Sequence, residues 1–189
     1  MVELNQRARL TIKLLEDALI SLLEEKSIYN VSIKELCDVA GINRSTFYKH
    51  FNSQIELLQF MEDRFIEDIM SYINESKNIN IPLKKRLKKV LDYIKDNYKF
   101  AKLLINNNVD PNFPKKLFTN SIIEEIFYNN YATSGNDKKF VNYTNVFLME
   151  GCFSVIKMRI NQKCDTSTTE LSDYIYKLNK IYQYNSSIK

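Results

Sequence analysis

The sequence is poor in the residues that break helices. Its 189 residues include only 3 glycines and 3 prolines, and tryptophan is absent. β-Sandwiches and barrels need a turn signal about every ten residues, so this composition argues against both. Abundant leucine, isoleucine, lysine and glutamate favour long helices instead. We therefore predict an all-α fold.

Histidine and cysteine are also scarce, and this limits the chemistry. There is one histidine, His50, and the three cysteines Cys37, Cys152 and Cys164 form no CxxC pair. The sequence therefore lacks the residues for a zinc site with several histidines. It also lacks the residues for histidine-centred nucleophilic catalysis away from residue 50. No paired nucleophile and base, glycine-rich phosphate loop or metal cluster is visible. We therefore predict that the protein is not an enzyme and binds no metal or cofactor. We also predict that its cysteines are buried, reduced thiols.

Long apolar runs are missing as well. No stretch approaches the length of a membrane span, and the N-terminus lacks the apolar core of a signal peptide. We expect a cytoplasmic protein without a membrane partner. Hydrophobic residues make up 44% of the chain, which is too much for a disordered protein. The formal net charge of +4 favours an anionic partner.

Two helix starts and a glycine turn stand close together between residues 31 and 51. Ser32, followed three residues later by Glu35, is a capping box that opens a short helix. This helix stops at Gly41, which can take the positive φ that a helix end often needs. Asn43 then caps a third helix that reaches about His50. Two short helices joined by a tight turn predict a helix-turn-helix unit.

The third predicted helix divides its faces clearly. Phe47 and Phe51 are its apolar anchors. The outward residues are hydrogen-bond donors, and none is acidic: Arg44, Ser45, Thr46, Tyr48, Lys49 and His50. Such donors suit phosphates and base edges, so we predict a nucleic-acid contact here.

Helical periodicity covers most of the remaining chain. Further helices are expected at about residues 6–26, 53–75, 82–96, 98–104, 115–131 and 138–160, and from residue 167 onward. Ser53 and Ser167 each open another capping box. The total is about nine helices and no convincing strand.

The segment from Val31 to Phe51 resembles the DNA-binding domain of the TetR family of bacterial transcriptional regulators. The turn Ala40-Gly41-Ile42-Asn43 and the run Thr-Phe-Tyr-Lys-His-Phe that ends at Phe51 are its most specific parts. The close resemblance covers about residues 6–58. Two C-terminal stretches are also similar to a subgroup common in Gram-positive bacteria, namely residues 98–104 and 149–156.

The resemblance implies an all-α homodimer. Residues 1–52 would form the helix-turn-helix domain, and residues 53–189 a larger helical domain for effector binding and dimerisation. The resemblance implies a transcriptional regulator that binds double-stranded operator DNA sequence-specifically. We interpret it as a repressor that a small apolar or aromatic effector releases from the operator. Two alternatives stay open. One is an activator or adaptor that works through a partner protein without a ligand, and the other is a helical interaction protein that only reuses the domain.

Individual DNA contacts are implied residue by residue. In the family the third helix enters the major groove, so Arg44 and Ser45 face bases and Lys49 can reach bases or phosphates. Phosphate contacts are implied for Ser32, Thr46, Tyr48 and His50. The family usually has lysine where this chain has Gln54. Its amide can still bind a phosphate, but one fewer counterion is released per half-site.

The effector and dimer sites are less defined by sequence. Aromatic residues suggest an effector pocket at Tyr93, Phe100, Phe118, Tyr143 and Phe147, although aromatics at helical spacing also suit a plain core. A helical glycine costs about 1 kcal/mol relative to alanine, so Gly151 indicates a close helix approach, within the domain or to the partner subunit. The predicted dimer residues are Gly151, Val155, Leu171, Tyr174, Ile175 and Leu178.

Charge is distributed unevenly along the chain. Residues 1–52 hold seven basic and seven acidic residues, so this part nets zero. Residues 84–102 hold eight basic and two acidic residues, a surplus of +6. Such a run is more often the solvated face of an amphipathic helix. A second nucleic-acid or acidic-effector surface stays open as the alternative for the run from Lys84 to Lys102.

Overall fold

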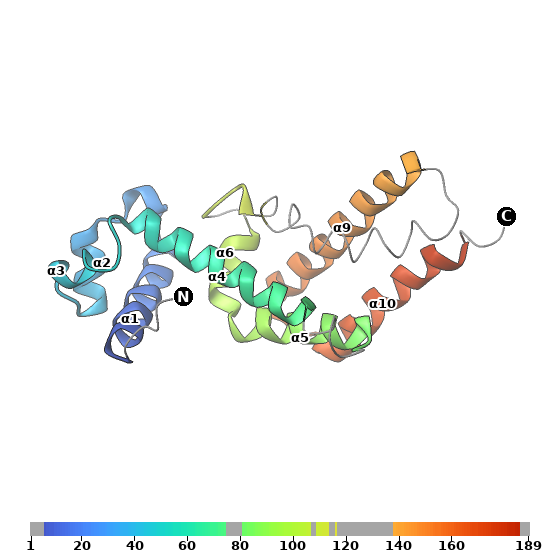
Figure 1. Cartoon of the computed structure of the whole chain (residues 1–189), viewed down its shortest axis with the longest axis horizontal. Helices are drawn as coiled ribbons and strands as arrows, with labels where there is room; N and C mark the ends of the chain where they lie inside the picture. The colour runs from blue at the N-terminus through green and yellow to red at the C-terminus, as the bar shows by residue number, and fades with distance from the viewer. Residues whose placement is uncertain (1–5, 75–80, 107–108, 114–115, 117–137, 186–189) are drawn as a thin grey trace.

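The chain is all-helical in a computed structural model that describes residues 6–74, 81–106, 109–113, 116 and 138–185. Within these ranges there are eight α-helices, one short 3-10 helix and no strand (Figure 1). The predicted fold class is confirmed, and the count is close to the nine helices expected. The helix predicted at residues 115–131 lies outside the described residues except for Lys116. No helix in the described ranges is long and apolar enough to cross a membrane.

Element bounds mostly agree with the periodicity of the sequence. In chain order the elements are α1 (Gln6–Leu23), η1 (Ile28–Asn30), α2 (Ile33–Ala40), α3 (Arg44–Phe47), α4 (Gln54–Asn74), α5 (Leu83–Asp96), α6 (Tyr98–Ile105), α9 (Lys138–Asn161) and α10 (Thr168–Asn185).

The third helix is shorter than predicted. Regular helix ends at Phe47 rather than near His50, because the next amides bond three residues back: Lys49 N–H to the Thr46 carbonyl and His50 N–H to that of Phe47. The Phe51 N–H still bonds the Phe47 carbonyl at 3.0 Å. The chain therefore continues as tight turns to Phe51, and the predicted face persists beyond α3. We call residues 44–51 the α3 segment.

All three predicted capping serines cap their helices. Each hydroxyl oxygen accepts the backbone N–H three residues on, at 3.2 Å in Ser32, 3.1 Å in Ser53 and 3.1 Å in Ser167. Glu170 completes its box by accepting the Ser167 N–H at 3.3 Å. These bonds satisfy amides that a helix start otherwise leaves unpaired. The helix starts predicted from sequence are thereby confirmed.

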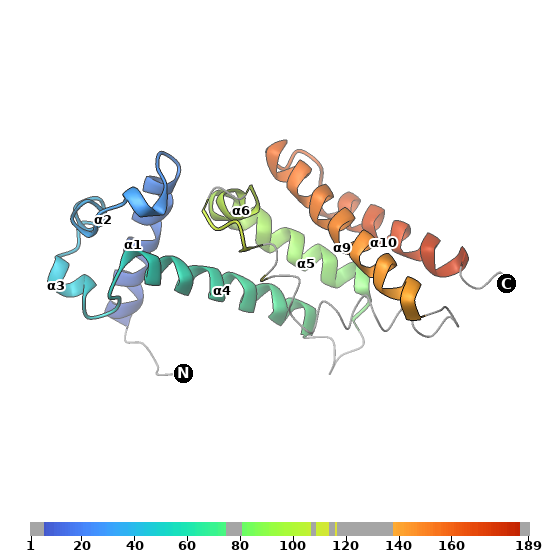
Figure 2. The same cartoon turned by 90° about the horizontal axis from the view of Figure 1, so that it is seen from above.

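The helices are arranged along one long axis. Helices α1, α2 and α3 lie together at one end, which we call the head, and α4 leads from the head into the rest of the molecule (Figure 1). Helix α5 lies beside α4 and packs against α10 on its other side (Figure 2). Helices α9 and α10 form the end opposite the head (Figures 1 and 2).

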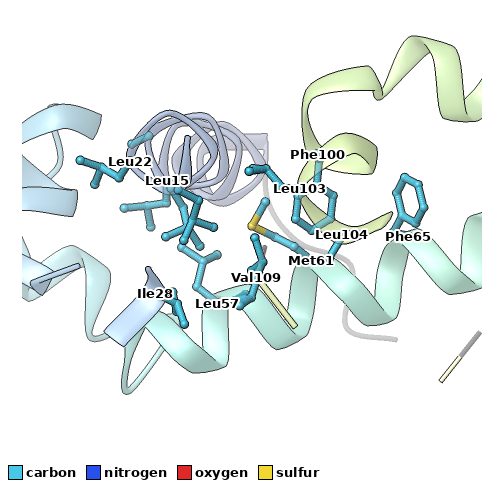
Figure 3. Close-up of a cluster of buried hydrophobic side chains, with 14 of the residues drawn as sticks. Leu15, Leu22, Ile28, Leu57, Met61, Phe65, Phe100, Leu103, Leu104 and Val109 are labelled. Atoms are coloured by element: carbon cyan, nitrogen blue, oxygen red, sulfur yellow. The ribbon is translucent and has the colours of Figure 1, made fainter. Parts of the chain in front are cut away.

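One hydrophobic cluster joins the head to the rest of the molecule. Figure 3 shows side chains from α1, α4 and α6 meeting, among them Leu15, Leu57 and Leu104, each 0% exposed. The cluster extends from the head to Ile160 of α9. It crosses the predicted boundary between residues 52 and 53, so the parts on either side share a core. The functional division of the chain at that boundary stays a prediction.

Candidate nucleic-acid interface

The turn between α2 and α3 depends on Gly41. Its φ of 65° lies in the left-handed region, where a side chain adds strain. The next amide, Ile42 N–H, bonds the Cys37 carbonyl at 3.0 Å and closes the end of α2. The Asn43 side chain then accepts the Ser45 N–H at 3.4 Å and starts α3. The turn is short because Gly41 ends α2 and Asn43, two positions later, caps α3.

Two phenylalanines hold the α3 segment on the head. Phe47 is 0% exposed and Phe51 is buried, and their ring centroids lie 6.0 Å apart. Phe51 also packs against Phe60 of α4, with centroids 5.5 Å apart. The prediction that both residues belong to the core is confirmed. Because their side chains face inward, the polar residues between them face away from the core.

The outward residues of the α3 segment form a surface of donors, which we call the α3 face. Arg44, Ser45, Tyr48 and Lys49 are exposed, and Thr46 and His50 are half-buried. No carboxylate of the described residues lies within ion-pair distance of Arg44 or Lys49. Their charges are therefore available to an external anion.

The two remaining predicted contacts lie at helix starts. Ser32 is exposed, and because its oxygen accepts the Glu35 amide, its hydroxyl proton can still be donated outward. Gln54 is the first residue of α4 and is half-buried. All eight predicted DNA-contacting residues thus belong to the head or to its junction with α4. Their contact with DNA stays a prediction.

The thiol behind this surface is shielded. Cys37 of α2 is 2% exposed, and burial raises the pKa of its thiol despite the opposing charge of Arg44. A protonated, buried thiol is a poor nucleophile. Cys37 therefore contributes packing. The prediction of a buried thiol is confirmed at Cys37, whereas Cys152 and Cys164 are half-buried.

Two of the four predicted effector-pocket residues that the structure describes come together. The Phe65 ring lies 5.2 Å from that of Tyr93 and 5.8 Å from that of Phe100. These three rings line a cleft of about 40 Å³ between α1, α4, α5 and α6. Pockets for drug-sized ligands are about 300–1,000 Å³, so the cleft alone is too small for one. Tyr143 and Phe147 are exposed on α9, away from this cleft, and Phe118 lies outside the described residues.

The predicted dimer residues also divide into two groups. Leu171 and Ile175 are 7% and 2% exposed because they pack against Leu91 of α5 within the same chain. The structure thus places these two in the chain's own core rather than on an outer surface. Val155 and Leu178 are half-buried, whereas Gly151 and Tyr174 are exposed.

An ion pair with a buried carboxylate lies beside the cleft and was not predicted from the sequence. Glu16 of α1 is 2% exposed, and its Oε1 lies 2.7 Å from Nη2 of Arg64 on α4. The signal was present, because Glu16 stands four residues after Ile12 and three before Leu19 on the apolar face of α1. An acidic residue in such a position needs a partner.

Part of the basic run on α5 is paired within the chain. Lys84 binds Asp173 of α10 at 2.7 Å, and Lys88 binds Asp92 at 2.6 Å. The Nε–H of Arg86 donates to the Ile81 carbonyl at 3.0 Å. These contacts support the interpretation of the run as the outer face of an amphipathic helix, part of which holds α10.

Two family profiles match the chain. Residues 15–60 match the profile described as bacterial regulatory proteins of the tetR family. Residues 82–180, just over half of the chain, match the profile described as a transcriptional regulator C-terminal region. The first match covers most of the head and the start of α4, and the second covers α5 to most of α10.

Solved structures show the same fold. The protein named dihydroxyacetone kinase operon activator DhaS has a TM-score of 0.64 at 19% identity, with 93% of this chain and 97% of that chain covered. A TetR transcriptional regulator from Streptococcus agalactiae has a TM-score of 0.61 at 19% identity, with 92% of this chain and 96% of that chain covered. A putative TetR-family regulator from Syntrophomonas wolfei has a TM-score of 0.62 at 16% identity, with 95% of this chain and 97% of that chain covered. No curated protein sequence matches this chain.

Proposed function

This chain belongs to the TetR family of DNA-binding transcriptional regulators, and we propose that it is a dimeric repressor released from its operator by a small-molecule effector. The observation that carries the proposal is the α3 face. Its exposed residues are donors without an acidic neighbour on the same face, and two buried phenylalanines fix their direction. Such a face suits the negative phosphates and the acceptor-rich base edges of the major groove.

The roles of the contact residues are those that the family resemblance implies. We assign Arg44 and Ser45 to base edges and Lys49 to bases or phosphates, and all three are exposed on α3 or the turn after it. The assigned phosphate contacts are Ser32, Thr46, Tyr48, His50 and Gln54. Selection from random double-stranded DNA tests this assignment, with one pseudo-palindromic sequence expected to be enriched. A protein that only reuses the fold for protein interactions would enrich no sequence.

Dimerisation is supported by the outer surface of α9. Exposed apolar and small residues repeat there at helical spacing, and we call them the α9 face: Tyr143, Val146, Phe147, Gly151, Ser154 and Met158. A Cβ added at Gly151 would have no atom of the described chain within 4 Å. Close packing inside the chain therefore does not explain this helical glycine, whereas approach of the α9 helix of a second copy does.

One substitution on each of two surfaces tests the dimer. Val146, 61% exposed on the α9 face, is changed to lysine, and Leu10, 62% exposed on α1, is changed to lysine as the matched control. Desolvating a lysine in an apolar interface is unfavourable, so Val146→Lys should give a monomer in analytical ultracentrifugation. Leu10→Lys should leave the mass of the assembly unchanged. Equal masses for both variants would rule out the α9 face as the interface.

Release by an effector would act through α4, which begins at the head and packs against α5. An effector shifts the equilibrium between DNA-binding and released forms only by its difference in affinity for them. We propose a small apolar or aromatic ligand, recognised in part by Tyr93 and Phe100. Ligand-dependent loss of operator binding is the direct test.

A transcriptional activator is the second candidate function. The cleft of about 40 Å³ is small for an effector, and one protein of similar fold is named as an operon activator. Deleting the gene and measuring transcription from the selected operator separates the two functions. Transcription should rise if this protein is a repressor and fall if it is an activator.

A further inference from the structure

We propose that the Glu16–Arg64 ion pair is a strut that fixes the head against α4 and thereby sets the half-site spacing that the dimer accepts. The inference rests on the dimeric, DNA-binding function proposed above. Both residues are positioning residues, because neither lies on the α3 face.

The pair spans the junction between the head and the rest of the chain. Glu16 lies on α1, and its side chain is 3% exposed, whereas Arg64 lies on α4 with a side chain 47% exposed. No described residue donates a well-aligned hydrogen bond to Glu16 Oε1, so its charge depends on the guanidinium 2.7 Å away. The carboxylate therefore stays compensated only while α1 keeps its place against α4.

Arg64 is itself held in place by its neighbours. Its guanidinium carbon lies 5.5 Å from the centroid of the Phe60 ring, one turn earlier on α4. Burial disfavours the guanidinium charge, but Glu16, together with Tyr93 and Asp68, raises the pKa of Arg64 above its usual value. One turn later, Asp68 accepts a hydrogen bond of 2.7 Å from the Tyr93 hydroxyl of α5. A row of polar contacts thus leads from α1 across α4 to α5.

Apolar packing alone would define this junction less sharply. Leu15 of α1, Met61 of α4 and Leu103 of α6 meet there, as Figure 3 shows. Burial of apolar surface is favourable but not directional, so such a contact tolerates small rotations. An ion pair with a buried carboxylate is satisfied at one relative position of the two helices. Its main contribution is then the orientation of the head, because a buried ion pair often adds little net stability.

Orientation matters because a dimer carries two heads. Once one head is bound, the second meets its half-site at an effective concentration that depends on the stiffness of the connection between them. A rigid connection favours one spacing strongly, and a loose one accepts several spacings but binds each less well. Breaking the strut should therefore change binding to paired half-sites and leave binding to one half-site intact.

The test removes both charges at once. The variant carrying Glu16→Met and Arg64→Met keeps the length of the residue 16 side chain, shortens that of residue 64, and leaves no unpaired buried carboxylate. Its melting temperature should therefore stay near that of the parent. Affinity for the selected operator should fall about tenfold, and operators with a spacer about one base pair longer or shorter should then bind within about threefold of it. Affinity for an isolated half-site should change by less than about twofold.

The matched control is Asp17→Asn. Asp17 is the next residue on α1 and pairs with Lys13 at 2.8 Å, but this exposed pair lies within one helix and crosses no junction. The control should keep the parent's spacing preference. Glu16→Gln, which keeps the shape of the side chain, serves as the second variant if the double variant does not fold.

The outcomes separate the strut from the function on which it rests. A folded double variant, or a folded Glu16→Gln variant, that keeps the parent's full spacing preference overturns the strut. A loss of affinity that is equal for paired and single half-sites also overturns it, because a purely structural defect predicts that result. A parent protein that selects no paired half-sites overturns the dimeric function, and the strut with it.

Discussion

Helix α5 and the α3 segment use positive charge in opposite ways. Residues 84–102 carry a surplus of +6, whereas residues 1–52 carry none. Yet two of the α5 lysines, Lys84 and Lys88, are in ion pairs with carboxylates of the same chain. Among the described residues, Arg44 and Lys49 of the α3 segment have no such partner. The number of charges therefore does not identify the surface that binds an anion, and their pairing and direction do.

The physical reason is that a cation must be available to a phosphate before it can release a counterion. A lysine already bound to aspartate loses that interaction when it turns to DNA, so its net gain is small. The α3 face, in contrast, presents its donors on a rigid backing of buried aromatic rings. The predictions below test this difference between the two regions.

The largest effect is expected from removing one of the buried phenylalanines that support the α3 face. Phe47 is 0% exposed, so Phe47→Ala should lower the free energy of unfolding by about 3–5 kcal/mol, mostly through the cavity left in the head. Operator binding should be lost as the α3 face loses its support. Chemical denaturation followed by circular dichroism measures the stability, and a fluorescence anisotropy titration measures the binding. Stable folding with unchanged affinity would show that the face does not depend on this anchor.

A base-reading residue of the α3 face should have a smaller and more selective effect. Arg44→Ala should cost about 1–3 kcal/mol of binding free energy if the guanidinium makes a bidentate contact with a base, and it should relax the preference at one base pair. Tyr48→Phe is the comparison variant. It removes one hydroxyl at an assigned phosphate contact and should weaken all sequences alike. Selection from random DNA with each variant measures both patterns, and an unchanged preferred site in Arg44→Ala would show that Arg44 does not read a base.

Local features of this chain were predictable from sequence because they depend on neighbouring residues. The capping serines, the stop at Gly41 and the inward phenylalanines each follow from spacings of a few residues, and the structure confirms them. The end of α3 was less predictable, because helical and tighter turns differ by one residue in their hydrogen bonding and both occur between Phe47 and Phe51. Sequence periodicity does not resolve such a choice.

Features that depend on helix packing were harder to predict. Leu171 and Ile175 have the spacing of an interface, but α10 turns them toward α5. The position of Glu16 on the apolar face of α1 indicates that it needs a partner, but the sequence does not show that this partner is Arg64, 48 positions later. Helical periodicity shows that a face is buried but does not show against which element. The same limit applies to the predicted effector residues. Of the four that the structure describes, Tyr93 and Phe100 come together at the cleft and Tyr143 and Phe147 do not.

A third prediction tests whether the α5 lysines are structural. Lys84→Met removes the partner of Asp173, whose Oδ1 is buried, and should lower the free energy of unfolding by up to about 1 kcal/mol. Lys85→Met is the matched control, because Lys85 is an exposed neighbour without an ion-pair partner in the described chain, and it should be neutral. Neither change should alter the salt dependence of operator binding. A shallower salt slope in both variants would instead make α5 a second DNA surface.

The smallest effect is expected from adding one positive charge at the start of α4. This change separates the effect of a charge's position from the effect of the net charge. Gln54, the first residue of α4, is assigned to a phosphate, so Gln54→Lys should steepen the slope of log affinity against log salt by about 0.9 per half-site. Gln59→Lys is the matched control, since it makes the same change on an exposed residue further along the same helix. If net charge governed binding, both variants would steepen the slope equally. Because a released counterion requires a cation close to a phosphate, we expect the change only at residue 54, and an unchanged slope there would place Gln54 away from the DNA.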